Sequence, residues 1–166
     1  MMKIQIGGLS EGVHSYRFQT NAPELGLQGG FKQEVLVVAT LDRTSSQILL
    51  KAQVQTTSTV SCDRCAGDFE CPISASYQMY YVHEGTESSA IDPTEVQLIP
   101  SGVGFIDIAE DVRQTVLLGI PLKLLCSENC RGLCPRCGTN LNNESCTCRN
   151  DEENSLWEML RPLRGN

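Results

Sequence analysis

The sequence has no apolar run that approaches the roughly 20 residues of a membrane-spanning helix. It also lacks an excess of positive charge, because 20 acidic residues outnumber 13 lysines and arginines and give a formal charge of −7. That balance argues against broad electrostatic capture of nucleic acid, while leaving room for a local basic face. The first residues, MMKIQIGGLSEG, contain neither a basic flank ahead of a long apolar core nor a cleavage site. We therefore expect a cytoplasmic protein with no membrane partner.

Histidine is scarce, and the common catalytic motifs are missing. The two histidines, His14 and His83, stand in segments with no nucleophile pattern around them. The sequence contains neither a phosphate-cradling GxxxxGKS or GxxxxGKT motif nor a nucleophile elbow. We therefore expect neither an enzyme nor a protein that acts on a small-molecule substrate.

What the sequence does have is enough apolar material for one folded domain with a small appendage. The chain has 166 residues, 40% of them hydrophobic, so it can bury an ordinary core. We expect a β-rich domain over residues 1–125 and a cysteine-rich segment over residues 126–166, packed together as one unit.

Alternating hydrophobicity predicts strands through the first half of the chain. In QILLKAQVQTTSTV, residues 47–60, Ile48, Leu50 and Val54 share one face, whereas Lys51 and Gln53 share the other. This is the pattern of a half-buried strand. The other expected strands are residues 3–6, 14–19, 31–41 and 73–82. Because the three long strands are joined by short connections, they predict an antiparallel meander.

One main helix is expected over residues 107–119. Asp107 and Glu110 have a spacing typical of a capping box at its start, and Gly119 and Pro121 end it. One side of this helix should lie against the sheet. The residues on that side are Ile108, Val112, Thr115, Val116 and Gly119.

Two further segments complete the expected fold. Residues 83–95, HEGTESSAIDPTE, have the composition of an exposed loop. SLWEMLRPL predicts a short terminal helix with Ser155 and Glu158 as its cap pair. The predicted fold class is α+β: an antiparallel β-meander packed against one main helix, with a cysteine-rich C-terminal segment and the short helix.

Nine cysteines are the most informative feature of the sequence. Cytosolic thiols are normally kept reduced, and an odd number cannot all pair, so metal binding explains them better than disulfides do. Eight of the nine fall into four close pairs. The pairs are Cys62/Cys65, Cys126/Cys130, Cys134/Cys137 and Cys146/Cys148.

Eight thiolates suffice for two Zn²⁺ sites with four cysteines each, and two groupings remain open. We favour local closure, in which Cys134/Cys137 join Cys146/Cys148 across the turn-forming loop GTNLNNES. Cys62/Cys65 then join Cys126/Cys130. The alternative joins Cys62/Cys65 with Cys134/Cys137, as in a zinc ribbon. Cys71 alternates with Ile73 and is expected to pack in the sheet as a small apolar residue.

The expected zinc sites are structural. A zinc ion held by four cysteines has no open position for water or substrate. For a redox role, Cys62 and Cys65 would need a thiol of low pKa at a helix N-terminus. This pair instead lies between two predicted strands.

Several basic residues flank the cysteine pairs. Four thiolates around one Zn²⁺ carry a net charge of −2, so two sites would take the formal charge from −7 to about −11. The flanking bases either offset this charge or form a rim that contacts RNA phosphate or a partner, with Arg161 and Arg164 adding to it. They are Arg64, Lys123, Arg131, Arg136 and Arg149.

Two stretches, STVSCDRCAGDFECPI and IPLKLLCSENCRGLCPRCGTNLNNESCTC, resemble the bacterial YceD family of large ribosomal RNA subunit accumulation proteins. The resemblance covers most of the chain. It implies a role in large-subunit ribosomal RNA accumulation without enzymatic activity, in a bacterial cytoplasm or a plant organelle. It also implies that the eight paired cysteines are the metal ligands. The tail departs from the family pattern, since ENSLWEML stands where a sequence like DPRW is typical.

Two hypotheses follow. In the first, a zinc-stapled binding module supports ribosomal RNA processing and ribosome assembly by binding ribosomal RNA, a ribosomal protein or an assembly factor. In the second, the protein is a structural interaction module whose zinc sites only stabilise the fold. The acidic balance favours a protein partner, or one confined RNA contact, over a broad RNA cradle.

Overall fold

A computed structural model describes residues 2–83, 95–100 and 102–148. The predicted terminal helix, most of the predicted loop at 83–95, and the basic residues Arg149, Arg161 and Arg164 lie outside the described residues.

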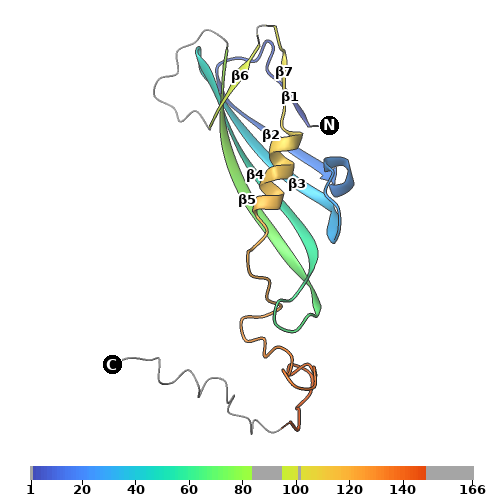
Figure 1. Ribbon diagram of the computed structural model, residues 1–166. Coiled ribbons are helices and arrows are strands. Elements are labelled where there is room, and N and C mark those ends of the chain that lie inside the picture. Colours follow the sequence, from blue (N-terminus) through green and yellow to red (C-terminus); the bar gives the residue numbers. More distant parts are fainter. Residues whose placement is uncertain (1, 84–94, 101, 149–166) are drawn as a thin grey trace, which may run out of the picture.

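The fold is built on a five-stranded sheet with the order β2-β3-β4-β5-β6 (Figure 1). Its first four strands are consecutive and antiparallel, which confirms the predicted meander, and β6 pairs in parallel with the end of β5. A separate two-stranded sheet joins β1 to β7, and a short 3₁₀ helix, η1 (Ala22–Leu25), follows β2. The strands are β1 (Lys3–Gln5), β2 (Gly12–Asn21), β3 (Phe31–Arg43), β4 (Gln47–Ser61), β5 (Asp68–His83), β6 (Val96–Ile99) and β7 (Phe105–Asp107).

The core lies on the face of the sheet to which the alternating pattern assigns its apolar residues. Leu50, Ala52 and Val54 of β4 are buried, and each stands opposite a buried residue of β3 in the antiparallel register. Lys51 and Gln53 point to the other face and are exposed. A shift of one residue would place the polar set in the core, so this pattern fixes the register.

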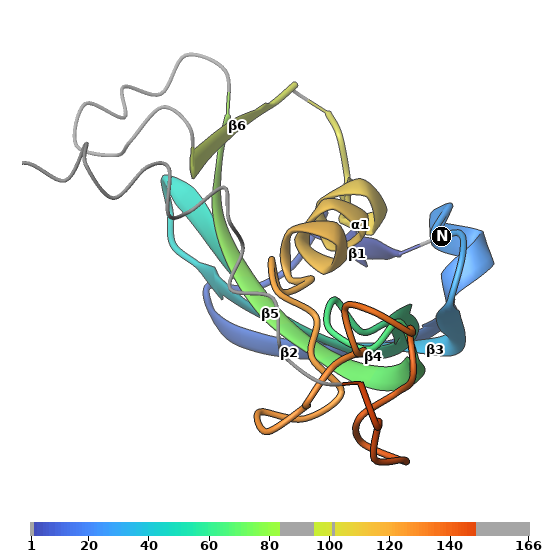
Figure 2. The same cartoon turned by 60° about the horizontal axis from the view of Figure 1, so that its bottom comes forward.

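Helix α1 (Ala109–Leu118) crosses the concave face of the curved sheet and packs against β4 and β5 (Figure 2). Val112, Thr115 and Val116 are buried, as the helical periodicity predicts. At the other end of the helix, a Cβ on Gly119 would lie 2.9 Å from the Cβ of Ala75 in β5. Gly119 therefore permits close packing of the helix end on the sheet.

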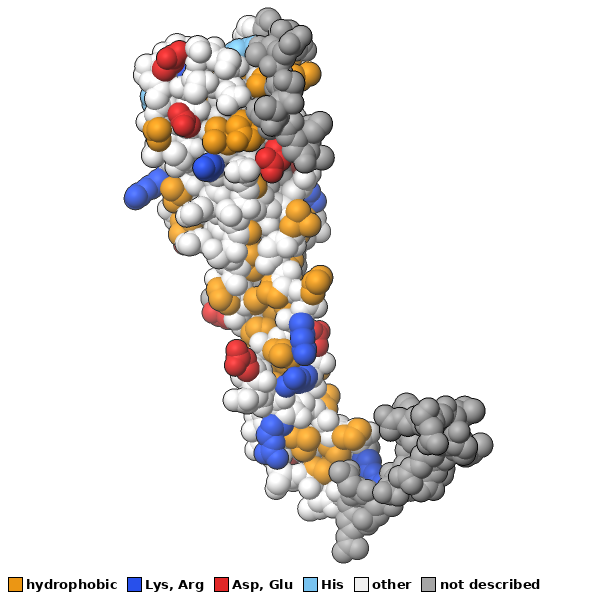
Figure 3. Space-filling model, turned by 90° about the vertical axis from the view of Figure 1, so that its left-hand side faces the viewer, with side chains coloured by type: hydrophobic (Ala, Val, Ile, Leu, Met, Phe, Trp, Pro, Cys, Tyr) orange, Lys and Arg blue, Asp and Glu red, His pale blue; other side chains and the backbone are white. Residues whose placement is uncertain are grey.

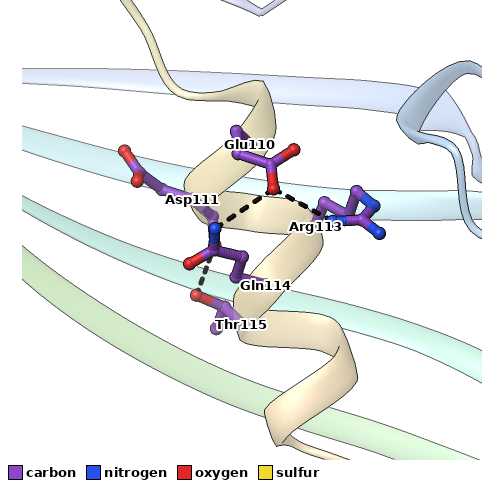
Figure 4. A network of polar contacts seen from close by, with 5 residues as sticks. All are labelled: Glu110, Asp111, Arg113, Gln114 and Thr115. Carbon is purple, nitrogen blue, oxygen red and sulfur yellow. Dashed lines mark hydrogen bonds and ion pairs between the residues drawn. The ribbon is translucent and has the colours of Figure 1, made fainter.

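The start of α1 differs from the prediction. The helix begins at Ala109 with Ile108 as its N-cap, and the Asp107 carboxylate accepts a hydrogen bond from the Ala109 amide at 3.1 Å. Glu110 does not complete the expected capping box. Its carboxylate instead accepts hydrogen bonds from Arg113 and Gln114 (Figure 4). Both partners lie within one helical turn of Glu110, where such pairs stabilise a helix directly.

The molecule is elongated, and residues 126–148 of the cysteine-rich segment lie beyond the far end of the β4–β5 hairpin (Figure 1). α1 and the two-stranded sheet lie toward the opposite end. In the part of the chain that the structure describes, no helix combines the length and apolar character needed to cross a membrane.

Candidate metal centre

Four cysteine sulfurs meet at the tip of the β4–β5 hairpin, and we call this group the proximal site. Cys62 and Cys65 come from the turn between the two strands, whereas Cys126 and Cys130 come from the segment after α1. The four sulfurs lie within 4.8 Å of one another. Two separations are 3.8 Å, between Cys62 and Cys130, and 3.7 Å, between Cys65 and Cys126.

Backbone hydrogen bonds hold both halves of the proximal site. The Ala66 amide donates to the Cys62 carbonyl, and the Cys62 amide donates to Gly67, which closes the hairpin turn. The segment after α1 is fastened to this turn by Asp63. Its amide donates to the Leu124 carbonyl at 2.8 Å, and its carboxylate accepts from the Leu124 amide at 2.7 Å.

The remaining four paired cysteines form a second group, which we call the distal site. Cys134, Cys137, Cys146 and Cys148 also place their sulfurs within 4.8 Å of one another. Gly138 adopts a left-handed backbone with φ of 73° and donates its amide to the Cys134 carbonyl. A glycine suits this turn because a Cβ is disfavoured in that conformation.

The structure groups the cysteines as in local closure, and the ribbon-like grouping does not form. A tetrahedron with metal–sulfur bonds of about 2.3 Å has sulfur–sulfur edges of about 3.8 Å. The two proximal separations match that length, and the distal pair Cys134 and Cys146 is closer, at 3.3 Å. Each of the nine cysteines is a free thiol. Cys71 is buried on β5 opposite Ser58, apart from both groups.

The two sites differ in exposure. Cys62, Cys65 and Cys130 of the proximal site are buried, and Phe69 and Leu125 pack against them. In the distal site only Cys134 is buried, whereas Cys137 and Cys148 are exposed. The distal site is therefore more accessible to solvent than the proximal site.

Hydrogen bonds to sulfur lower the pKa of one or more thiols in each site. The Cys126 amide donates to the Cys62 sulfur at 3.4 Å and lowers the pKa of Cys62 to about 6. The Thr139 hydroxyl lies 3.2 Å from the Cys137 sulfur, and it lowers the pKa of that thiol to about 6. The pKa values of Cys126 and Cys148 rise to about 12, chiefly because each thiol hydrogen-bonds to a neighbouring cysteine sulfur, that of Cys130 and that of Cys137, and would lose this bond on ionising. A bound cation would favour ionisation of all four thiols of a site.

One residue of the predicted basic rim, Arg64, has a structural role. Arg64 donates from Nη1 to the carbonyls of Glu128 and Cys130, at 3.2 and 2.9 Å, so its guanidinium ties the hairpin turn to the segment that carries the ligands. Lys123, Arg131 and Arg136 are exposed on the same end of the molecule. Figure 3 shows basic side chains at this narrow end, mixed with hydrophobic and acidic ones.

Two residues that no sequence pattern singles out also shape the sites. Asp63 stands between Cys62 and Cys65, and Asn142 stands in the loop GTNLNNES. Asn142 donates from Nδ2 to the Cys130 sulfur at 3.3 Å. Its position in the loop between two ligand pairs was visible in the sequence, but its contact with the other site was not.

These features define a class: a small α+β protein whose curved sheet carries two groups of four cysteines able to hold metal ions. The sequence profile described as "Large ribosomal RNA subunit accumulation protein YceD" matches residues 50–164, more than half of the chain. The chain belongs to this YceD family, which confirms the resemblance seen in the sequence.

Two curated plant proteins are similar to the chain, and both are named "Large ribosomal RNA subunit accumulation protein YCED homolog 1, chloroplastic". The protein from Zea mays is 28% identical over 182 residues, which cover 89% of this chain and 61% of the maize protein. The protein from Arabidopsis thaliana is 26% identical over 147 residues, which cover 74% of this chain and 46% of that protein. The chain thus spans less than two thirds of the length of either relative. No solved structure matches it.

Proposed function

We propose that this protein is a non-enzymatic, zinc-stabilised factor that supports accumulation of large-subunit ribosomal RNA. Family membership and the names of the two relatives support the ribosomal role. The single observation that carries the zinc is the meeting of four sulfurs from distant chain segments at separations that suit a tetrahedral ion. Such a factor would act in a reducing compartment that contains ribosomes, such as a bacterial cytoplasm.

Zn²⁺ is the ion that this donor set favours. All-cysteine tetrahedral sites hold Zn²⁺ or iron, and zinc neither oxidises thiolates nor needs a further ligand. Cys62, Cys65, Cys126 and Cys130 would hold one ion, and Cys134, Cys137, Cys146 and Cys148 the other. Because four thiolates close the coordination sphere, the ions would stabilise the fold and take no part in a reaction.

We favour a protein of the large subunit, or one of its assembly factors, as the direct partner over naked RNA. The chain carries a formal charge of −7, and proteins that bind ribosomal RNA are basic because they must neutralise phosphate. The guanidinium of Arg64, moreover, is engaged with backbone carbonyls. The acidic balance therefore favours a protein partner met through a mainly apolar contact over a broad contact with RNA phosphate.

Three exposed leucines at the end of α1 and in the segment after it offer an apolar contact for such a partner, and we call them the leucine surface. Leu118, at the end of α1, is 86% exposed, and Leu122, in the segment that leads to Cys126, is 106% exposed. Leu117 is 40% exposed. Because large exposed apolar side chains are candidates for interaction sites, we assign the leucine surface to the ribosomal partner.

The ratio of large- to small-subunit ribosomal RNA tests this function in cells that lack the gene. We expect its loss to lower the ratio and the wild-type chain to restore it. Cys71→Ala should also restore it, whereas Cys65→Ala should not, because only Cys65 belongs to a metal site although both cysteines are buried. An unchanged ratio in cells without the gene would reject the function. Equal rescue by the two variants would reject the need for the proximal site.

A further inference from the structure

The loop that closes the distal site also reaches into the proximal site. Residues 138–145 connect Cys137 to Cys146, both of the distal group. From the middle of this loop, Asn142 donates through Nδ2 to the sulfur of Cys130, a proximal cysteine, at 3.3 Å. Asn142, from the loop of the distal site, thus contacts a cysteine of the proximal site. The two sites have no cysteine in common.

The orientation of the Asn142 amide is set by its other hydrogen bonds. Its Oδ1 accepts from the Arg131 amide at 2.7 Å, so the NH₂ group must face the Cys130 sulfur. The same NH₂ group also donates to Asn140 Oδ1 at 2.8 Å. The backbone amide of Asn142 donates to that same oxygen at 3.0 Å. These contacts hold the donor in place.

Backbone contacts extend the connection from the distal loop to the hairpin turn. Leu133 and Asn140 form an antiparallel bridge, and the Leu141 amide donates to the Gly132 carbonyl at 2.9 Å. The Leu133 amide in turn donates to Arg64 in the hairpin turn at 3.1 Å. Gly132 lies so close to Arg64 that a Cβ there would be 3.0 Å from its carbonyl oxygen. The distal loop, the segment with Cys130 and the hairpin turn are therefore packed in series.

We propose that the two metal sites are thermodynamically coupled and that Asn142 is the positioning residue that couples them. This inference rests on the proposed zinc binding. When an ion draws Cys137 and Cys146 together, it closes the ends of the 138–145 loop and places Asn142 against Cys130. An N–H donor offsets negative charge on a thiolate, so the proximal site binds its ion more tightly when the distal site is filled. Linkage requires the reverse effect to be equal in size.

Cobalt titration of the reduced, metal-free full-length chain tests this coupling, because tetrahedral Co²⁺–thiolate sites absorb visible light and report binding directly. Asn142→Ala should weaken Co²⁺ binding at the proximal site by about 10–100-fold, the usual effect of losing a hydrogen-bond partner of a ligand. Asn143→Ala is the matched control, since within residues 2–83, 95–100 and 102–148 Asn143 contributes only its backbone amide, to the Asn140 carbonyl. That variant should bind like the wild type.

A double-mutant cycle separates coupling from a local effect of the side chain. In Cys137→Ser/Cys148→Ser, which lacks the distal site, proximal Co²⁺ affinity should fall, and adding Asn142→Ala should lower it little further. Coupling is overturned if loss of the distal cysteines leaves the proximal Co²⁺ affinity unchanged. It is also overturned if Asn142→Ala lowers that affinity by the same factor with and without the distal cysteines. A wild-type chain with no Co²⁺–thiolate absorption would overturn zinc binding as well. Two separate sites of unaltered affinity would overturn only the coupling.

Discussion

Asp111 is an acidic side chain placed where α1 packs on the sheet. It lies in the first turn of the helix, and its carboxylate accepts a hydrogen bond from the Tyr81 hydroxyl at 3.4 Å. Burial raises the pKa of Asp111, whereas the Tyr81 hydrogen bond acts in the opposite direction. Burial and the Asp111 charge likewise raise the pKa of Tyr81 and of Tyr77. Ionised Asp111 is therefore a destabilising element of an otherwise apolar contact.

This placement predicts a pH effect on stability. An acid whose pKa is raised in the folded state binds its proton more tightly there, so its contribution to stability falls as pH rises through the shifted pKa. We expect the melting temperature of Asp111→Asn minus that of the wild type to increase as pH rises above the ordinary carboxyl pKa of about 4. Tyr81→Phe should steepen the fall of wild-type stability over the same range, since it removes the bond that lowers the pKa. Melting curves by circular dichroism measure both, and a difference that stays flat with pH would contradict the assignment.

At the scale of single residues, the sequence predicted which cysteines come together but not the contacts that support them. Close spacing marks cysteine pairs as ligands because a short turn can present two thiolates to one ion. The Asn142 contact with Cys130 depends on how two loops pack, and neither spacing nor composition encodes it. The same holds for Asp63, whose partner Leu124 is 61 residues away.

At the scale of elements, prediction succeeded where the periodic pattern was long. β3, β4 and β5 have 13, 15 and 16 residues, so the alternation is repeated several times in each. β6 and β7 have 4 and 3 residues, which is too short for a periodic signal, and they were missed. β6 also pairs in parallel with β5 after a long connection, which hydrophobic alternation does not report. The capping box was wrong because Glu110 has partners within its own helix.

The end of α1 and the segment after it supply a testable binding element. Leu118→Ser/Leu122→Ser should lower cosedimentation of the protein with immature large ribosomal subunits about tenfold or more, because exposed apolar anchors often dominate an interface. Val13→Ser is the matched control, since Val13 is 67% exposed on β2, away from the leucine surface. Binding should also change little as salt is raised, as expected for a mainly apolar contact.

The salt dependence of binding distinguishes a protein partner from RNA, the alternative partner. If the double leucine variant cosediments like the wild type and binding falls steeply with salt, the contact is made with RNA phosphate. That result would overturn the assignment of the leucine surface to a protein.

At the scale of the whole molecule, stability is divided between two regions. The apolar core lies between the sheet, α1 and β1, whereas the described part of the cysteine-rich end has only the small cluster of Cys62, Cys65, Cys130, Phe69 and Leu125. The grouping of the cysteines could be predicted because closing a short loop has a low entropic cost. The elongated shape could not, since it depends on how far β4 and β5 extend beyond the helix (Figure 1).

With Zn²⁺ in both sites, as we propose, this division predicts unequal unfolding on removal of the metal. A zinc chelator should disorder residues 126–148 while leaving the β2–β5 sheet folded, because metal binding energy is folding energy only for the cysteine-rich end. Hydrogen exchange measured by mass spectrometry should show lost protection in that segment and in the Cys62–Cys65 turn, with protection retained in β3 and β4. Added Zn²⁺ should restore protection. Global unfolding on chelation, or no change at all, would contradict the prediction.

The cysteines of the proximal site are synthesised at different times. Cys65 leaves the ribosome 61 residues before Cys126, the sulfur that it meets in the folded protein. At about 5–20 residues per second, the hairpin tip waits about 3–12 seconds with two reactive thiols and no closing partner. During that interval a peroxide or a tightly binding copper ion can reach the thiols of Cys62 and Cys65, which are buried in the folded protein. Cells short of zinc or under oxidative stress should therefore lose newly made chains well before they lose old ones.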